Sequence, residues 1–150
     1  MHSRTDMMPL TLMLLHPKKL LLFLALCSLS AFADERFSGQ WEGENAAGSV
    51  LTLDLKQSAQ MINGTYCYIT QRGNRIDCAA PGETNLRGTS TGNRADVAFD
   101  STFGGVNGRA FLEVEGDRMT WRLIKVPVKG GYYAPQTFTL TRNHDGIQSR

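Results

Sequence analysis

Apolar and polar side chains alternate along short stretches of this chain, the pattern of strands with one buried face. The alternation is clearest at 51–55, where three leucines take one face and a threonine and an aspartate take the other. A hairpin is indicated where 111–114 and 119–123, both rich in large apolar residues, flank the turn at 115–117. Strands of this kind are predicted at 37–43, 49–57, 61–70, 75–79, 85–90, 94–100, 106–114, 118–125 and 136–142.

From residue 34 onward, no stretch keeps helical periodicity over the roughly ten residues that an ordinary helix needs. Short sequential strands joined by glycine-containing turns are typical of a meander. About eight such strands can close on themselves, which removes exposed sheet edges. We therefore expect an all-β fold, an antiparallel up-and-down meander of about eight strands closed into a small barrel. A β-sandwich with a similar number of strands is the alternative.

The start of the chain has the three regions of a secretory signal peptide. Two lysines precede the apolar run at 20–26, and Ala31-Phe32-Ala33 is a cleavage site of the small-residue type. We expect residues 1–33 to be a signal peptide that is cleaved after Ala33. A membrane anchor is disfavoured because the apolar run is too short for a bilayer core of about 30 Å. A lipoprotein signal ending at Cys27 is disfavoured because a leucine, not a small residue, precedes it.

Cleavage would leave enough chain for one hydrophobic core but not for two. We expect a single β-barrel domain over residues 34–143, followed by a flexible tail over 144–150. A signal peptide of this bacterial type predicts a periplasmic or secreted protein of a Gram-negative-type envelope. It also predicts that no membrane span remains once the leader is removed.

The charge of the predicted exported part excludes one class of partner. The chain has 16 Lys+Arg and 14 Asp+Glu, and 13 of each lie beyond residue 33, so the net charge there is near zero. Nucleic-acid binding needs clustered basic residues that displace counterions from the phosphates. We therefore expect no nucleic-acid partner.

Removal of the leader also removes Cys27 and leaves Cys67 and Cys78. The turn sequence at 71–74 lies midway between them, so they would face each other across a β-hairpin as a close, non-hydrogen-bonded pair. An even number of cysteines in an exported domain is typical of a disulfide. Zinc binding, the competing interpretation, lacks further ligands because His144 is the only histidine beyond the leader. We predict a Cys67–Cys78 disulfide, no metal site and no cofactor.

Side chains suited to catalysis are sparse. A nucleophilic triad needs a base, and His144 lies six residues from the C-terminus, where it is expected to be solvated. Glu42 and Glu44 alternate on one strand, and Asp54, Asp96 and Asp100 lie on others, but a solvated strand face gives the same spacing. A hydrolase that uses such carboxylates is the weaker hypothesis. We therefore expect that the protein is not an enzyme and that it acts by binding.

The longest irregular connection, 127–135, contains Gly130-Gly131-Tyr132-Tyr133. Two tyrosines on a glycine-rich loop are costly to expose without a partner, and tyrosine is enriched at recognition surfaces. Tyr132 and Tyr133 are therefore candidate partner-binding residues. The alternative is a loop folded over the end of the barrel with both tyrosines buried.

Several short motifs, in order along most of residues 39–140, resemble those of the avidin and streptavidin family, which belongs to the calycin group of small β-barrels. They are Gly39-Gln40-Trp41, Asn45-Ala46-Ala47-Gly48-Ser49, Gly64-Thr65-Tyr66, Leu86-Arg87-Gly88, Met119-Thr120-Trp121-Arg122-Leu123 and Gln136-Thr137-Phe138-Thr139. The resemblance implies a calycin-like barrel with a small-molecule site at its mouth. In that family, the asparagine and serine of the second motif and the tyrosine of the third bind the ureido oxygen of biotin.

The departures from the family concern the ligand. Gln136 stands where the family has an aspartate that binds a ureido nitrogen, and Phe99 stands where a tryptophan wall is expected. The bulky Tyr68 replaces a small hydroxyl residue. The biotin site is therefore not retained, and the resemblance implies a site for a different small molecule. Its candidate ligand-binding residues are Asn45, Ser49, Tyr66, Trp121 and Gln136.

Two functions of different kinds follow. The first is an exported, non-catalytic binding protein of the cell envelope whose barrel mouth binds an unidentified small molecule. The alternative is a periplasmic protein-binding module, of the lysozyme-inhibitor or toxin-immunity type, that reaches its target with the 127–135 loop. Avidin-like barrels assemble through their faces, so a homo-oligomer is a further expectation of the resemblance, although nothing in the sequence fixes a symmetry.

Overall fold

The computed structural model describes residues 34–145. The predicted signal peptide over 1–33 and residues 146–150 of the predicted tail lie outside the described residues. In the described part, no helix has the length and apolar character needed to cross a membrane. A short 3-10 turn, η2 (Gln71–Gly73), follows the third strand. The strands are β1 (Gly39–Glu44), β2 (Val50–Ser58), β3 (Met61–Thr70), β4 (Arg75–Cys78), β5 (Leu86–Thr91), β6 (Arg94–Phe99), β7 (Gly108–Glu115), β8 (Arg118–Lys125) and β9 (Thr137–Asn143).

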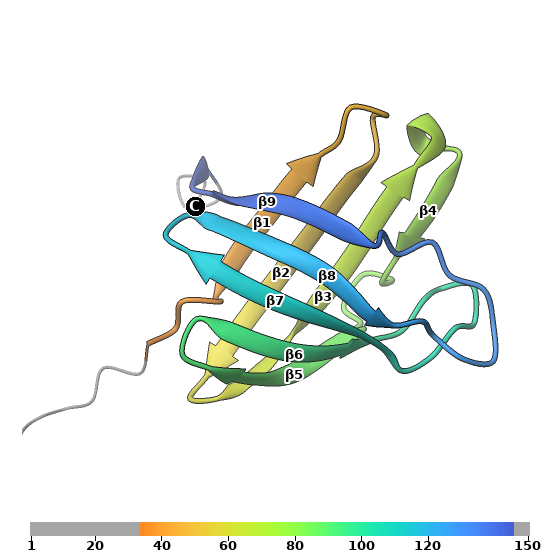
Figure 1. Cartoon of the computed structure of the whole chain (residues 1–150). Helices are drawn as coiled ribbons and strands as arrows, with labels where there is room; N and C mark the ends of the chain where they lie inside the picture. The colour runs from red at the N-terminus through yellow and green to blue at the C-terminus, as the bar shows by residue number, and fades with distance from the viewer. Residues whose placement is uncertain (1–33, 146–150) are drawn as a thin grey trace, which may run out of the picture. The chain divides into compact units, whose positions relative to one another are not determined.

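Eight of these strands close into a barrel in the order β1-β2-β3-β5-β6-β7-β8-β9, and β9 pairs back onto β1 (Figure 1). Every pair is antiparallel, and consecutive strands are neighbours except where the chain passes from β3 through β4 to β5. The predicted all-β meander closed into a barrel is therefore confirmed, and the alternative of a sandwich is wrong. The remaining strand, β4, pairs with the end of β3 beside the ring.

The alternation in the sequence places one face of each strand inside the barrel. On β2, Leu51, Leu53 and Leu55 are buried, while the residues between them face outward. On β8, Met119 and Trp121 are fully buried and are separated by an exposed threonine. Successive side chains of a strand point to opposite faces, so burial of apolar surface selects this register and no other.

Aromatic rings fill the interior of the barrel. Trp41, Tyr66, Phe99 and Trp121 expose none of their surface, so no water-sized space adjoins them. Phe37, just ahead of β1, is equally buried, and its backbone N–H donates to the Gln57 side chain at 3.1 Å. Eight strands enclose a space that side chains can fill. The barrel is therefore a packed core and not an open tube.

The pairing of the first and last strands, β1 and β9, closes the ring. Arg142 on β9 places its guanidinium carbon 4.1 Å from the ring centre of Trp41 on β1. The same guanidinium donates hydrogen bonds to the carbonyls of Ser38 and Arg36, the latter at 2.8 Å. Trp41 Nε1 in turn donates to the Phe37 carbonyl at 2.9 Å. This cluster fixes the chain that leads into β1 against the end of β9.

Strands β3 and β4 form a hairpin around residues 71–74, as predicted. Cys67 lies opposite Cys78 in the register, their Cα atoms are 4.0 Å apart, and a disulfide joins them. The short separation is that of the closer, non-hydrogen-bonded type of pair. The predicted disulfide is confirmed, and it ties β4 to the barrel.

Several predicted strand ends are displaced by one or two residues, and one of these shifts has a clear local cause. The strand expected at 106–114 begins only at Gly108. Asn107 adopts a left-handed φ of 56°, which interrupts an extended strand. Val106 instead forms an isolated bridge with Val128 in the connection between β8 and β9.

Candidate functional site

Two residues of the predicted ligand-binding set, Tyr66 and Trp121, lie together inside the barrel. Tyr66 on β3 and Trp121 on β8 have stacked rings whose centres are 5.6 Å apart, with planes inclined at 23°. Phe99 at the end of β6 contacts both, and its ring centre lies 5.0 Å from that of Tyr66 and 5.3 Å from that of Trp121. Trp121 Nε1 donates to the carbonyl of Pro135 at 3.0 Å. We call Tyr66, Phe99 and Trp121 the aromatic cluster; the connection from β8 to β9 contacts it directly.

The other three predicted residues lie at the rim of this end. Asn45 is exposed, and its side-chain oxygen accepts hydrogen bonds from two backbone N–H groups of the β1–β2 turn, each at 3.0 Å. Ser49 is buried and donates to Thr70 Oγ1 at 3.1 Å. Gln136 is exposed, and its backbone carbonyl accepts from a β8 N–H. The structure thus brings two of the five residues into ring contact; a ligand-binding role for all five stays a prediction.

The hydroxyl group of Tyr66 is buried and has no hydrogen-bond partner. Burial raises the pKa of this hydroxyl, and the proximity of Asp77 and Tyr68 raises it further. Asp77 acts on the hydroxyl through its charge and as a nearby acceptor, although the two groups lie outside normal hydrogen-bond geometry. Buried polar atoms nearly always have a partner, so an unpaired one demands an explanation.

Asp77 on β4 is fully buried at the same end and organises the loops there. Its carboxylate accepts hydrogen bonds from Ser101 Oγ at 2.8 Å, from the Thr102 N–H and hydroxyl at 2.9 and 3.1 Å, and from the Tyr133 N–H at 3.3 Å. Sequence reasoning missed this residue, because an aspartate in a short alternating strand is typical of a solvated face. The one available signal was its position beside Cys78, which the disulfide holds against the barrel.

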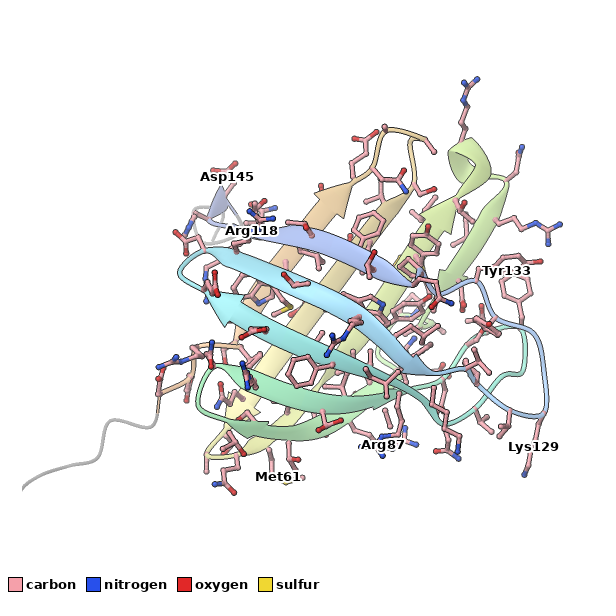
Figure 2. All side chains as sticks on the ribbon, in the orientation of Figure 1. Met61, Arg87, Arg118, Lys129, Tyr133 and Asp145 are labelled. Carbon is pink, nitrogen blue, oxygen red and sulfur yellow. A yellow bond between two sulfur atoms is a disulfide. The ribbon has the colours of Figure 1, made fainter. Side chains whose placement is uncertain are left out.

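Both candidate partner-binding tyrosines are partly buried, and Tyr133 lies over this end (Figure 2). Tyr133 packs edge-on against Phe103, with ring centres 4.7 Å apart. Arg75 of β4 places its guanidinium carbon 4.7 Å from the Tyr133 ring centre and hydrogen-bonds its hydroxyl. Tyr132 also packs against the core. Both tyrosines therefore help to cover the barrel, and their role in binding a partner stays a prediction.

Beside them, the loops 101–107 and 126–131 are joined by two isolated bridges, one parallel and one antiparallel, and project together beyond the barrel (Figure 1). The parallel bridge joins Gly104 to Gly131. The backbones approach so closely that a Cβ added to Gly130 would lie 2.2 Å from the Gly104 carbonyl carbon. Glycine is required here for close packing between the loops. We call this paired segment the end ribbon.

The carboxylates considered for catalysis are dispersed over the surface. Glu42 and Glu44 are exposed on β1 and line a shallow external hollow of about 480 Å³. Asp96 and Asp100 form ion pairs at 3.1 Å with arginines of neighbouring strands. Within residues 34–145, no group of three or more His, Cys, Asp or Glu is placed to hold a metal ion. These four carboxylates thus have the surroundings of a solvated surface.

The fold defines this protein as a small, closed antiparallel β-barrel with a disulfide-tethered hairpin at one end, an architecture compatible with calycin-like barrels. Comparisons with protein-family models, with curated proteins and with solved structures give no match. The avidin-like motifs therefore stay a resemblance, and a functional proposal has to rest on the aromatic cluster and the loops around it.

Proposed function

We propose that this protein is an exported, non-catalytic binding protein of the cell envelope that takes up a small molecule at the aromatic cluster. The observation that carries the proposal is the buried hydroxyl of Tyr66, which has no partner. An unpaired buried hydroxyl costs about 1–3 kcal/mol, and a ligand that supplies the missing hydrogen bond recovers this free energy. The flat faces of Trp121 and Phe99 beside it suit a planar, mostly apolar group.

The protonation state of Tyr66 limits the chemistry of the ligand. A tyrosine hydroxyl is neutral at physiological pH and available as a donor, and the raised pKa of Tyr66 extends this to more alkaline solution. The carboxylate of Asp77 nearby disfavours a negatively charged ligand atom at this position. The ligand class that fits best is a neutral planar molecule with a carbonyl-type acceptor.

Binding of a ligand requires part of the loops over the barrel end to move, since no water-sized space adjoins Tyr66. Residues 132–135 are the segment to move, because the Pro135 carbonyl accepts a hydrogen bond from Trp121 and the Tyr133 N–H donates one to Asp77. These contacts can separate without unpairing any strand of the barrel. Loops carried on a rigid scaffold commonly act in this way.

The proposed cellular setting rests on two features. The leader at 1–33 has the regions of a secretory signal peptide. The Cys67–Cys78 disulfide belongs to an oxidising compartment, because cytosolic thiols are kept reduced. Both support a periplasmic or secreted protein.

The first test is native mass spectrometry of the protein purified from the periplasm of an expressing bacterium. A mass that begins after Ala33 supports export, and retention of the leader contradicts it. The second test is fluorescence titration with prodan, a neutral naphthyl ketone. We expect saturable binding to the wild type, binding weakened about tenfold by Tyr66→Phe through loss of one hydrogen bond, and no change with Tyr132→Phe. Absence of saturable binding, or equal binding by Tyr66→Phe, overturns the small-molecule site.

A further inference from the structure

Exposed large apolar side chains gather at the end ribbon. Six such side chains are found among the described residues, and four of them belong to the ribbon or lead into it, with exposed fractions of 42% to 54%. Ile124, Val126 and Val128 alternate with neighbours along one extended segment, and the intervening Pro127 is buried. The fourth side chain, Phe103, lies on the facing loop. Large apolar side chains exposed together on neighbouring segments point to an interaction surface.

The ribbon is held in one conformation before any partner arrives. Val106 and Val128 exchange two backbone hydrogen bonds at 2.9 Å, and the Gly131 N–H donates to the Phe103 carbonyl at 3.0 Å. The contacts of Asp77 fix the base of both loops. A surface ordered in advance loses little conformational entropy on binding, which favours tight association.

The tip of the ribbon holds a strained lysine. Lys129 adopts a left-handed φ of 74°, although two glycines follow it directly. Glycine adopts this conformation without steric cost, whereas a lysine does not. Residues held in such conformations cluster at functional sites. Lys129 lies at the outermost part of the ribbon, where its side chain points away from the barrel (Figure 2).

We propose that the end ribbon docks into an acidic, apolar-walled groove of a protein partner. Residues 101–107 and 124–134 contain two lysines, Lys125 and Lys129, and no acidic residue. Neither lysine forms an ion pair with any described residue. A second copy of this chain is a poor occupant, because a symmetric contact through the ribbon would bring the lysines of both copies together. The inference does not depend on the small-molecule site, since none of these side chains belongs to the aromatic cluster.

Site-specific photocrosslinking identifies the occupant. The photoreactive residue p-benzoylphenylalanine replaces Val128 in the full chain, expressed with its leader in a bacterium. The matched control carries it in place of Thr91, an exposed residue that ends β5 and lies outside the end ribbon. We expect a protein adduct at position 128 that is absent at position 91. The crosslinked protein is then purified and its dissociation constant measured.

Three variants show whether the ribbon is the contact. We expect Val128→Asp and Lys129→Gly each to raise the dissociation constant about tenfold, and Thr91→Asp to leave it unchanged. Added salt should weaken binding of the wild type more than binding of Lys129→Gly. Lys129→Gly should also raise the melting temperature, because it relieves the left-handed backbone, so weaker binding is not a result of unfolding.

Several results overturn the proposal. One is the absence of an adduct at position 128 beyond that at 91. A second is a crosslinked protein that, once purified, binds the wild type, Val128→Asp and Lys129→Gly equally. A third is an adduct with a second copy of this chain. A fourth is binding of the wild type to phosphatidylglycerol vesicles that Val128→Asp abolishes, which would identify the ribbon as a lipid-binding surface.

Discussion

The carboxylate of Asp77 accepts a hydrogen bond from the backbone N–H of Tyr133 at 3.3 Å, across 56 positions of sequence. The same carboxylate binds Ser101 and Thr102, so one side chain joins β4, the loop after β6 and the connection from β8 to β9. Strand β4 is in turn tied to the barrel by the disulfide at Cys78. The loops over the aromatic cluster are therefore fixed by one buried carboxylate.

Replacement of Asp77 should destabilise the protein and loosen these loops. Asp77→Ala leaves four donors without their acceptor, and we expect the free energy of unfolding to fall by about 3 kcal/mol. Asp77→Asn keeps an acceptor oxygen, so its free energy of unfolding should lie between those of Asp77→Ala and the wild type. Urea denaturation measures the change, and hydrogen exchange should quicken at the Thr102 and Tyr133 amides but not in β8. A loss under about 1 kcal/mol would show that the network contributes little.

Removal of the unpaired hydroxyl should not destabilise the fold. Tyr66→Phe deletes a buried polar atom that has no partner, and we expect the free energy of unfolding to rise by up to about 1 kcal/mol. Tyr132→Phe, at a partly exposed position, is the control and should have little effect. Denaturation of the unliganded proteins makes the comparison. A clear loss of stability in Tyr66→Phe would mean that the hydroxyl has a hydrogen-bond partner.

The raised pKa of Tyr66 should destabilise the folded state in alkali. Below the ordinary value of 10.0, the hydroxyl is protonated in both states and contributes no pH dependence. Above it, only the unfolded state ionises, so the folded state loses up to about 1.4 kcal/mol per pH unit until its own pKa is reached. Tyr66→Phe should lack this component. Parallel curves of unfolding free energy against pH for the two proteins would contradict the expectation.

Loss of the disulfide should lower stability without opening the barrel. The bond between Cys67 and Cys78 spans 11 positions, and a loop of this length constrains the unfolded chain by about 3 kcal/mol. We expect the double replacement with alanine to lower the free energy of unfolding by about this amount, while far-ultraviolet circular dichroism stays that of a β-barrel. The closed ring does not include β4, so collapse of the β signal would show that the hairpin is needed for closure.

The contact between Arg142 and Trp41 should contribute more to stability than the ion pair of Arg142 with Asp117. Arg142→Ala removes a cation–π contact and two hydrogen bonds to carbonyls, and we expect a loss of about 2 kcal/mol. Asp117 pairs with Arg142 at 3.3 Å but is 67% exposed, so Asp117→Ala should cost under about 0.5 kcal/mol. Thermal unfolding ranks the two. An equal loss would place the stabilisation in the ion pair instead.

The barrel and the disulfide could be predicted because both leave local signals. The leucines of 51–55 and the apolar residues of 119–123 report their buried face through period-two alternation alone. The cysteine pair is symmetric about a turn, so its register follows from counting. Phe37 shows the limit of this method, since it is fully buried just outside a strand and its burial depends on the closed ring.

The candidate site was less predictable because its geometry comes from distant segments. Motif resemblance grouped five residues, yet Asn45 serves mainly to cap its own turn. Asp77 gives no pattern of its own, because its partners lie more than 20 positions away in two loops. The left-handed conformation of Lys129 also leaves no signal in the sequence, since glycine adopts such a backbone without steric cost and two glycines follow this lysine. Tertiary contacts decide these positions.

The pairing of β1 with β9 also determines at what stage of folding the barrel can close. Gln40 and Asn143, which face each other in this pairing, are 103 positions apart, so the ring cannot be completed until nearly the whole described chain is available. Folding dominated by such distant pairings is slow. The export proposed above would benefit from that delay, because a chain crosses a membrane more readily unfolded than as a completed barrel. The position of the last strand in the sequence thus delays closure of the barrel until β9 is available.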